Sequence, residues 1–565
     1  MDFLLHHTLR TSAERFPQSE ALVDGDTRLT FAQLTTRVER LAAGLQQVGV
    51  ERGERVGVLL EPGVQLAESL YAISAAQAVF VPMHHSLKPE QVAHVINDCG
   101  IRLLITAAER THELIDVPAT CPTFEQTVVS AAADAAAEPS PLDYETLIAT
   151  ERIGPPAEVA IGRDLCAILY TSGSTGKPKG VMLSHDNMLA GAGIVSDYLG
   201  IHGGDRLLAA LPFSFDAGLN QLTTAVQQGA ALVFVRFRFA RDIVSVLAKE
   251  RITGLGGVPP LWNLLAQRNS GLAKTDLPHL RYITNTGGAM PQKTLAALRA
   301  ALPGTDVVLM YGLTEAFRST YLPPAELDRR PTSMGRAIPN TEILVVNEAG
   351  DICQPGEPGE LVHHGPTVSL GYWGQPELTQ KVLRPHPSPP PGSGDAGPRV
   401  CYSGDIVRTD EDGFLYFLGR RDNLIKSSGF RVSPSEVEDA LFQTGFVQAA
   451  AVVGAADEML GQKIIAYVVL KEADQATDQT TATGRPTAAT ANGRPTEADI
   501  LTATATRLPR HMVPSRLEIR PALPRTSSGK TNYALLREEA GGRCESGASA
   551  ARPRQTDTQP AEVTP

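Results

Sequence analysis

Apolar residues along the chain follow two spacings, one typical of buried strands and one typical of helices. Unbroken apolar runs predict short buried strands at 56–60, 103–106, 207–211, 231–235 and 307–310. Between such runs apolar residues recur every three or four positions, as in the helix predicted behind a capping box at 30–33. Strands that alternate with helices in this way form α/β layers around a largely parallel sheet. We therefore predict an α/β fold.

The pattern changes toward the C-terminus, which predicts a second, smaller domain. A capping box at 433–436 opens a short helix that leads to an apolar run at 449–453. Residues 473–499 are rich in Thr, Ala and Gly and contain two copies of Gly-Arg-Pro-Thr, a composition typical of a disordered insertion. We predict a large α/β domain at 1–421, a small α+β domain at 422–540 and a disordered tail at 541–565.

Composition and charge narrow the range of partners. The 565 residues include 51 Lys and Arg against 62 Asp and Glu, a formal net charge of −11, and 5% are aromatic. Nucleic acids and anionic membranes attract basic surfaces, and base stacking needs aromatic rings, so neither partner is expected. The cysteines form no CxxC pair, and no basic segment precedes an apolar run at the N-terminus. Both features predict a cytoplasmic protein without disulfides or a zinc site.

The segment LYTSGSTGKPKGVMLSH at 169–185 carries the strongest chemical signal. It follows an apolar run at 166–169 and combines glycines, hydroxyl residues and two lysines. Glycine lets the backbone approach phosphate oxygens, hydroxyls donate hydrogen bonds and lysine supplies positive charge. Neither lysine is followed by Ser or Thr, so the segment is not the Walker A loop of a P-loop NTPase.

Four further motifs follow in order: YGLTE at 311–315, YSGD at 402–405, GRRD at 419–422 and SGK at 528–530. With the glycine-rich segment they resemble the AMP-forming adenylating superfamily, which includes acyl-CoA synthetases, adenylation domains of nonribosomal peptide synthetases and luciferases. The resemblance implies a large N-terminal domain and a small, mobile C-terminal domain. It also implies ATP and Mg²⁺ as cofactors, and transfer of a small carboxylic acid to a phosphopantetheine thiol on coenzyme A or on a carrier protein.

The resemblance assigns the phosphates and the metal to two of these motifs. Thr314 is expected at the α-phosphate, and Glu315 is expected to help hold Mg²⁺. The β- and γ-phosphates are expected at Thr171, Ser172, Gly173, Ser174, Thr175, Gly176 and Lys179.

The nucleoside end of ATP has its own expected contacts. Gly287, Gly288 and Ala289 are expected along the adenine edge, and Tyr311, followed by Gly312, is expected to stack on its face. Asp405 would accept hydrogen bonds from the ribose hydroxyls, and Arg420 would contact ribose or phosphate.

Two lysines of the small domain complete the implied machinery. Lys530 is expected to bridge the substrate carboxylate and the α-phosphate, where its charge stabilises the transition state. Asp422 matches the hinge, about which rotation would withdraw Lys530 and bring Lys426 forward for thioester formation. Asn532 and Tyr533 follow Lys530 in place of the Asp-Arg that is common in the superfamily.

The acid is the open question, and four residues bear on it. Phe215 and Asp216, followed by Asn220, resemble amino-acid adenylation domains, in which the aspartate pairs with the substrate ammonium. Asp216 could instead be the N-cap of a helix at 218–228. Arg318 falls at the expected pocket wall, where it would read a second anionic group or pair structurally with an acid.

The wider sequence looks closest to two stand-alone branches of the superfamily. One loads an amino acid, often proline, onto a separate carrier protein, and the other contains acyl-CoA-ligase-like proteins associated with exosortase systems. About 35 residues follow Lys530, too few for a carrier domain, so the thiol is expected from a separate molecule. We predict an amino-acid ligase that acts on a separate carrier protein, with an acyl-CoA ligase for an unaminated acid as the alternative.

Overall fold

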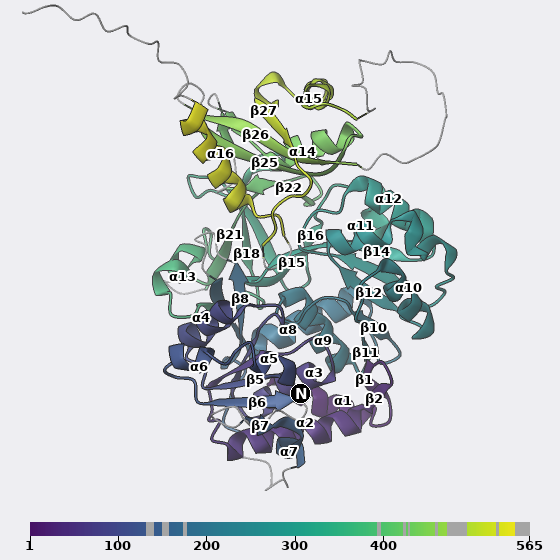
Figure 1. Ribbon diagram of the computed structural model, residues 1–565, viewed down its shortest axis with the longest axis vertical. Coiled ribbons are helices and arrows are strands. Elements are labelled where there is room, and N and C mark those ends of the chain that lie inside the picture. The colour runs from purple at the N-terminus through teal and green to yellow at the C-terminus, as the bar shows by residue number, and fades with distance from the viewer. Residues whose placement is uncertain are drawn as a thin grey trace, which may run out of the picture. The chain divides into compact units, whose positions relative to one another are not determined.

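The computed structural model describes residues 1–130, 141–149, 158–172, 178–392, 397–421, 425–427, 430–457, 461–471, 494–526 and 530–547. The chain divides into two compact units, Met1–Phe417 and Leu418–Pro565 (Figure 1). Strand β22 (Leu415–Arg420) spans this division, and the predicted boundary at 421/422 falls directly after that strand.

One sheet of the first unit has nine strands. Its strands are β1 (Glu20–Asp24), β2 (Thr27–Thr30), β10 (Arg206–Ala209), β11 (Ala231–Phe234), β12 (Gly254–Gly257), β13 (Tyr282–Asn285), β14 (Asp306–Leu313), β15 (Ala316–Leu322) and β16 (Arg336–Ala337). Their order is β16-β15-β14-β13-β12-β10-β11-β1-β2. The pairs from β14 through β1 are parallel, whereas β2, β15 and β16 join antiparallel at the two edges.

A second sheet of the first unit has eight strands. Its strands are β3 (Arg55–Leu59), β4 (Val79–Pro82), β5 (Leu103–Ala107), β6 (Gln126–Ser130), β7 (Leu142–Asp143), β8 (Leu165–Ser172), β9 (Pro178–Ser184) and β19 (Gly371–Tyr372). Their order is β19-β9-β8-β4-β3-β5-β6-β7, and β9 runs antiparallel to both of its neighbours. The largely parallel, α/β organisation predicted from the apolar runs is confirmed.

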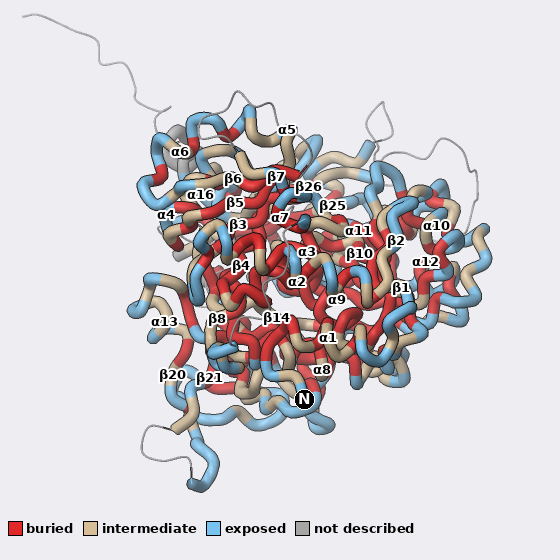
Figure 2. The backbone as a smooth tube through the Cα atoms, turned by 90° about the horizontal axis from the view of Figure 1, so that it is seen from below, coloured by how far each residue is buried: buried red, intermediate tan, exposed pale blue. Residues whose placement is uncertain are grey.

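Helices fill the space between the two sheets and cover their outer faces. The inner layer contains α1 (Leu5–Arg15), α2 (Phe31–Gln47), α3 (Val64–Ala75), α7 (Tyr144–Ala149), α8 (His185–Leu199) and α9 (Asp216–Gln228). These helices share one apolar core with strands of both sheets. The outer layers are α10 (Ala240–Lys249), α11 (Pro259–Leu265) and α12 (Gln292–Ala301) on the nine-stranded sheet, and α4 (Pro89–Cys99) and α6 (Val117–Thr120) on the eight-stranded sheet. Figure 2 shows buried residues in the central strands and inner helices, and many exposed residues on the outer helices.

The capping box predicted at the start of α2 is present. The Thr30 backbone N–H donates to the Gln33 side chain at 2.9 Å, and the Gln33 backbone N–H donates to the Thr30 hydroxyl at 3.3 Å. Two N–H groups without helical partners are thereby satisfied.

A third sheet of the first unit carries one of the predicted nucleotide motifs. Its strands are β17 (Glu342–Val346), β18 (Gly359–His364), β20 (Leu383–Pro385), β21 (Arg399–Thr409) and β22, in the order β17-β18-β21-β20 with β22 also paired to β21. The remaining short helices of this unit are α5 (Ala108–Thr111), α13 (Pro376–Val382), η1 (Arg268–Ser270), η2 (Leu272–Lys274) and η3 (Pro324–Glu326).

The second unit is a small α+β domain built on one sheet. The strands are β23 (Ile425–Ser427), β24 (Phe430–Val432), β25 (Val447–Asp457), β26 (Gly461–Leu470) and β27 (Arg516–Ile519), and the helices are α14 (Pro434–Gln443), α15 (Glu497–Ala505), η4 (Arg510–Met512) and α16 (Tyr533–Gly547). The strand order is β24-β23-β26-β25, with β27 beside β26. The predicted cap of α14 is present, because the Ser433 hydroxyl accepts from the Glu436 backbone N–H at 3.4 Å.

Two sequence predictions at the C-terminal end are wrong at their boundaries. Residues 497–499 do not belong to a disordered insertion but form the first turn of α15, which a capping box between Thr496 and Asp499 begins. The insertion predicted from 473 lies outside the described residues as far as residue 493. Residues 541–547 continue α16, which buried Leu536 and Ala540 anchor to the sheet. Both errors arose because these boundaries were predicted from residue composition, without regard to helix capping and burial.

Among the described residues, no helix combines the length and the apolar composition needed to span a bilayer.

A carboxyl group of the second unit makes its stability depend on pH. Glu438 on α14 accepts hydrogen bonds from the Val452 backbone N–H at 2.8 Å and from the Tyr533 hydroxyl at 3.0 Å. Burial raises the pKa of Glu438 from 4.5 to about 8. Between these two values the folded state binds a proton that the unfolded state does not, so the free energy of unfolding falls as the pH rises from about 4.5 to about 8.

Glu438→Gln should remove this pH dependence, because glutamine accepts both hydrogen bonds without a charge. We expect the unfolding midpoint of the variant to match the wild type at about pH 5 and to exceed it at about pH 9. Thermal unfolding followed by circular dichroism measures both, with exposed Glu436→Gln on the same helix as the control. Equal shifts at the two pH values would contradict the raised pKa.

Candidate active site

The strands on either side of the glycine-rich segment pair with each other. Strands β8 and β9 pair antiparallel, with Thr171 opposite Lys179 and Ser172 opposite Pro178. Gly173, Ser174, Thr175 and Gly176 lie outside the described residues. The segment continues into a strand, whereas a P-loop continues into a helix, and this difference agrees with the missing Walker A pattern.

The YGLTE motif forms a second hairpin, between β14 and β15. Thr314 and Glu315 are the two turn residues, with Leu313 paired to Ala316. The pairing register shifts between Tyr311 and Leu313, so β15 bulges opposite Gly312. Bulges redirect side chains beside binding sites.

Tyr372 of β19 connects these two hairpins. Its hydroxyl donates to Glu315 Oε1 at 2.5 Å, and the Lys179 ammonium lies 6.0 Å from the centre of its ring. Tyr372 is buried, so it fixes the carboxylate against a rigid core. The structure thereby brings together the lysine expected at the phosphates and the glutamate expected at the metal.

Asp405 is presented by a second bulge, in β21. The register shifts between Glu360 and Val362 of β18, and Gly404 at the bulge has φ +74°. The Gly404 backbone N–H donates to Glu360 at 2.9 Å, and the Asp405 backbone N–H donates to the Ser403 hydroxyl at 3.0 Å. Asp405 is 5% exposed, and it accepts a short hydrogen bond from the Tyr311 hydroxyl. The two residues expected at adenine and ribose are therefore in contact.

The buried thiol of Cys401 lies in the field of the carboxylates expected at the metal and at the ribose. Burial raises the pKa of this thiol well above its usual range, and the negative charges of Glu315, Glu360 and Asp405 raise it further. Negative charge is therefore concentrated at this edge of β21. Mg²⁺ prefers carboxylate and phosphate oxygens, so the Glu315 carboxylate, held by Tyr372, fits one ligand position of this ion.

The predicted adenine segment lies against a predicted substrate residue. Asn285 ends β13, and its side-chain amide donates to the Gly288 carbonyl at 2.8 Å, which closes the turn before Ala289. The Phe215 ring lies 3.6 Å from the position that a β-carbon of Gly287 would occupy. Phe215 thus stands beside the adenine segment, directly before α9.

Helix α9 begins at Asp216 and not at residue 218, which overturns the N-cap interpretation of Asp216. The N-cap position belongs to Phe215, whose side chain has no hydrogen-bonding group. Asp216 occupies the first helical position and is 4% exposed. A β-carbon on Gly218 would lie 2.2 Å from the Pro212 carbonyl oxygen, so only glycine allows this close approach of helix and loop.

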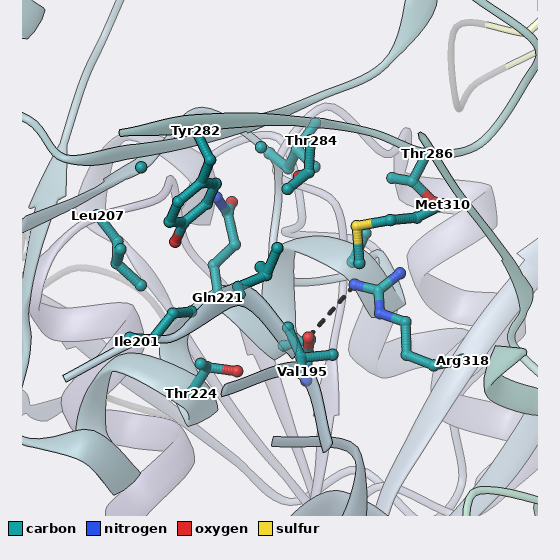
Figure 3. A pocket seen from close by; sticks show the side chains of 16 residues that line it. Val195, Ile201, Leu207, Gln221, Thr224, Tyr282, Thr284, Thr286, Met310 and Arg318 are labelled. Carbon is teal, nitrogen blue, oxygen red and sulfur yellow. Dashed lines mark hydrogen bonds between the residues drawn. The ribbon is translucent and has the colours of Figure 1, made fainter. Parts of the chain in front are cut away.

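Asn220 and Arg318 meet inside a pocket of the first unit (Figure 3). Asn220 lies one helical turn after Asp216 and is 2% exposed, and Arg318 is 4% exposed in the bulge of β15. Arg318 Nη2 donates to Asn220 Oδ1 at 3.4 Å. Within the part of the chain that the structure describes, no carboxylate forms an ion pair with Arg318, so a structural acid partner is not found.

The remaining predicted residues belong to the second unit. Arg420 ends β22, and Lys426 lies in β23 opposite Arg431 of β24. Lys530 is exposed, and its carbonyl oxygen accepts from the Thr526 backbone N–H at 2.8 Å. The predicted hinge residue, Asp422, lies outside the described residues.

Tyr372 is the residue that the sequence argument missed. It lies in a Gly-Tyr-Trp triplet, and a buried aromatic in a short strand is indistinguishable from a core residue at the level of sequence. Its role depends on a contact with Glu315, which is distant along the chain.

Comparison with known proteins now identifies the class. A family model described as "AMP-binding enzyme" matches residues 9–373, and one described as "AMP-binding enzyme C-terminal domain" matches residues 436–530. The chain belongs to the AMP-binding enzyme family. It is an AMP-forming acid–thiol ligase that uses ATP and Mg²⁺, as the predicted superfamily implies.

Similar proteins include a much longer synthase subunit and enzymes of about the length of this chain. A linear gramicidin synthase of Brevibacillus parabrevis is 30% identical over 98% of this chain, which spans only 6% of that protein. Feruloyl-CoA synthase of an Amycolatopsis species is 31% identical over 94% of this chain and 97% of its own length. O-succinylbenzoate coenzyme A synthetase from Bacillus subtilis, solved with ATP and magnesium ion, has a TM-score of 0.76 at 25% identity, covering 94% of this chain and 98% of that one.

Tyr372→Phe should weaken the first half-reaction by releasing the Glu315 carboxylate. A hydrogen bond to a charged group contributes about 1.5–3 kcal/mol, so we expect the rate of ATP–pyrophosphate exchange to fall about tenfold or more. The magnesium concentration at half-maximal rate should rise. Tyr416→Phe, which removes a tyrosine–carboxylate bond outside these motifs, is the control. An unchanged magnesium dependence would show that Tyr372 does not position Glu315.

Proposed function

We propose that this ligase adenylates an amino acid and transfers it to the phosphopantetheine thiol of a separate carrier protein. In the first step a substrate carboxylate oxygen bonds to the α-phosphorus of ATP, and the bond to the bridging oxygen breaks as pyrophosphate leaves. In the second step the thiol sulfur bonds to the carbonyl carbon, its proton is lost, and AMP leaves. The first step gathers several negative groups, so catalysis rests on positioning and charge neutralisation.

The hairpin residues of the first unit neutralise and hold the triphosphate. Lys179 and Thr171 face each other at the end of the β8–β9 hairpin, and Thr314 lies in the neighbouring turn. Glu315, fixed by Tyr372, provides a metal ligand. When bound, Mg²⁺ neutralises phosphate charge.

The nucleoside is assigned to the bulge of β21 and to the turn after β13. Tyr311 and Asp405 lie in contact, so a ring for adenine and a carboxylate for the ribose hydroxyls stand next to each other. Gly287, Gly288 and Ala289 would line the adenine edge.

Asp216 is the observation that supports an amino-acid substrate. Its carboxylate is almost fully removed from water at the first position of α9, where Phe215 is the N-cap residue. The positive end of the helix dipole favours a carboxylate there. Asn220, four residues later on the same helix face, lines the pocket. A substrate ammonium would be a partner of opposite charge for such a buried carboxylate.

Lys530 is proposed to complete adenylation from the second unit. It is exposed on a turn closed by a bridge between Arg525 and Thr531. As a flexible point charge it would stabilise the charge that develops between substrate and α-phosphate. Arg420 is proposed at ribose or phosphate, Lys426 in thioester formation and Asp422 as the hinge.

A second candidate is an acyl-CoA ligase for an unaminated acid. The feruloyl-CoA synthase relative matches this chain over 97% of its length, and its acceptor, as its name states, is coenzyme A. The two candidates share every residue of the nucleotide site, and they differ in the partner of Asp216 and in the thiol.

Lys530→Ala should abolish adenylation while ATP still binds. Loss of one preorganised charge from a transition state costs about 100- to 1,000-fold in rate. ATP–pyrophosphate exchange measures the rate, and calorimetry measures ATP binding. Lys471→Ala removes an exposed lysine from the same unit as the control. Exchange at the wild-type rate would refute the role of Lys530.

Asp216→Asn should separate the two candidates, because it removes the charge at nearly constant volume. With amino acids we expect kcat/KM for exchange to fall by about 30-fold or more, and with their deaminated counterparts to change little. Asp242→Asn, a half-exposed first-turn aspartate of α10 that accepts backbone hydrogen bonds, controls for the helix dipole. Equal losses for both substrate classes would exclude the ammonium contact.

A further inference from the structure

The pocket that holds Arg318 is enclosed by the inner helices and the nine-stranded sheet. Its cavity volume is about 40 Å³, and α8, α9, β12, β13, β14 and β15 contribute to its walls. Figure 3 shows the Arg318 guanidinium beside Met310, directed into this space. Apolar and polar side chains both line it, and Arg318 is the charged residue among them.

Arg318 is buried without a compensating negative charge in the described part of the chain. Its Nη2 bonds weakly to Asn220, and its Nε–H has no hydrogen-bond partner. A buried charge without a partner costs several kcal/mol, which a neutral amide does not offset.

Another buried arginine of the same unit is paired with carboxylates. Arg330 is 8% exposed, and its three guanidinium nitrogens bind Asp410 at 3.0 Å and, more closely, Glu326 and Asp412. Arg318 and Arg330 are the two buried arginines among the described residues. Arg330 therefore has the contacts of a structural arginine, and Arg318 does not.

Further unsatisfied polar atoms line the same pocket. Asn220 Nδ2, Gln221 Oε1 and Thr224 Oγ1 are buried without hydrogen-bond partners in the described structure. They lie on the pocket face of α9, and Asn220 Nδ2 adds a second N–H donor beside the Arg318 guanidinium. Two donor groups, one of them charged, form a site for an anion such as a carboxylate.

We propose that the acid activated by this ligase carries a second carboxylate, which Arg318 and Asn220 bind inside the pocket while the first carboxylate reacts. This inference rests on the proposed function only in that the pocket holds the acid. It adds a substrate class, the dicarboxylic acids, with an amino group where Asp216 binds one. The second carboxylate forms no covalent bond and leaves unchanged with the product.

The test compares dicarboxylates with their monoamides in ATP–pyrophosphate exchange. The panel contains glutarate and adipate, glutamate and 2-aminoadipate, and the corresponding monoamides. We expect the wild type to prefer at least one dicarboxylate over its amide by about 30-fold or more in kcat/KM. Arg318→Met should lose this preference, Arg318→Lys should keep part of it, and Arg299→Met, at an exposed ion pair, should not change it.

The unfolding midpoint of the substrate-free protein tests the proposal independently. Replacing a structural arginine would lower it, whereas replacing an unpaired buried arginine would raise it. Because Arg318 is buried without a carboxylate, Arg318→Met should raise the unfolding midpoint of the substrate-free protein. A lower midpoint, or exchange that prefers acids with uncharged tails, would overturn the proposal.

The outcomes separate this inference from the proposed function. Preference for a dicarboxylate without an amino group would support the Arg318 site and refute the ammonium contact of Asp216. Preference for amino acids with uncharged side chains would support the ammonium contact of Asp216 and refute the Arg318 site. If no acid supported exchange, adenylation itself would fail, and the midpoint of Arg318→Met would still decide whether Arg318 is structural.

Discussion

A charge removed from water needs a partner, and this constraint governs the active site of the first unit. Asp216, Arg318 and Asp405 are each at most 5% exposed. Asp405 has the Tyr311 hydroxyl beside it, in the place expected for a ribose. Asp216 lies one helical turn before Asn220. Arg318 donates a hydrogen bond to the Asn220 side chain. Arg318 lines the pocket, and we propose that the substrate carries a negative charge that complements it.

Irregular backbone places these groups. Regular strands alternate side chains between two faces, so a residue is redirected only where the pairing register breaks. Arg318 lies in the bulge of β15 and Asp405 in the bulge of β21. Gly218 brings the first turn of α9 against the preceding loop, which sets the position of Asp216. Tyr372 then links the hairpin of Glu315 to that of Lys179.

Much of the fold could be predicted from the sequence, and the motifs singled out candidate nucleotide residues, two of which lie in contact in the structure. The apolar runs predicted β3, β5, β10, β11 and β14, because buried parallel strands are nearly continuous in apolar residues. The motifs predicted Tyr311, Glu315 and Asp405, whose chemistry is local to short segments. The order of the strands and the partner of Glu315 depend on contacts between distant segments, which local patterns do not encode.

The alternatives that the sequence left open for Asp216 and Arg318 have a similar physical cause. Asp216 had the residue type of an N-cap, but the helix begins at that residue and Phe215 takes the cap position. Arg318 had the residue type of an ion-pair partner, but its surroundings have to be seen before its missing acid is apparent. Residue type fixes what a side chain is able to do, and the surrounding packing decides which of these roles it has.

The central claim is that this chain forms an acyl-adenylate before any thiol takes part. The most direct measurement is the incorporation of labelled pyrophosphate into ATP by the wild-type chain, with Mg²⁺, one carboxylic acid at a time and no thiol. The account predicts incorporation that depends on the acid and on Mg²⁺. Cleavage of ATP to ADP and phosphate, or incorporation that requires a thiol, would contradict it.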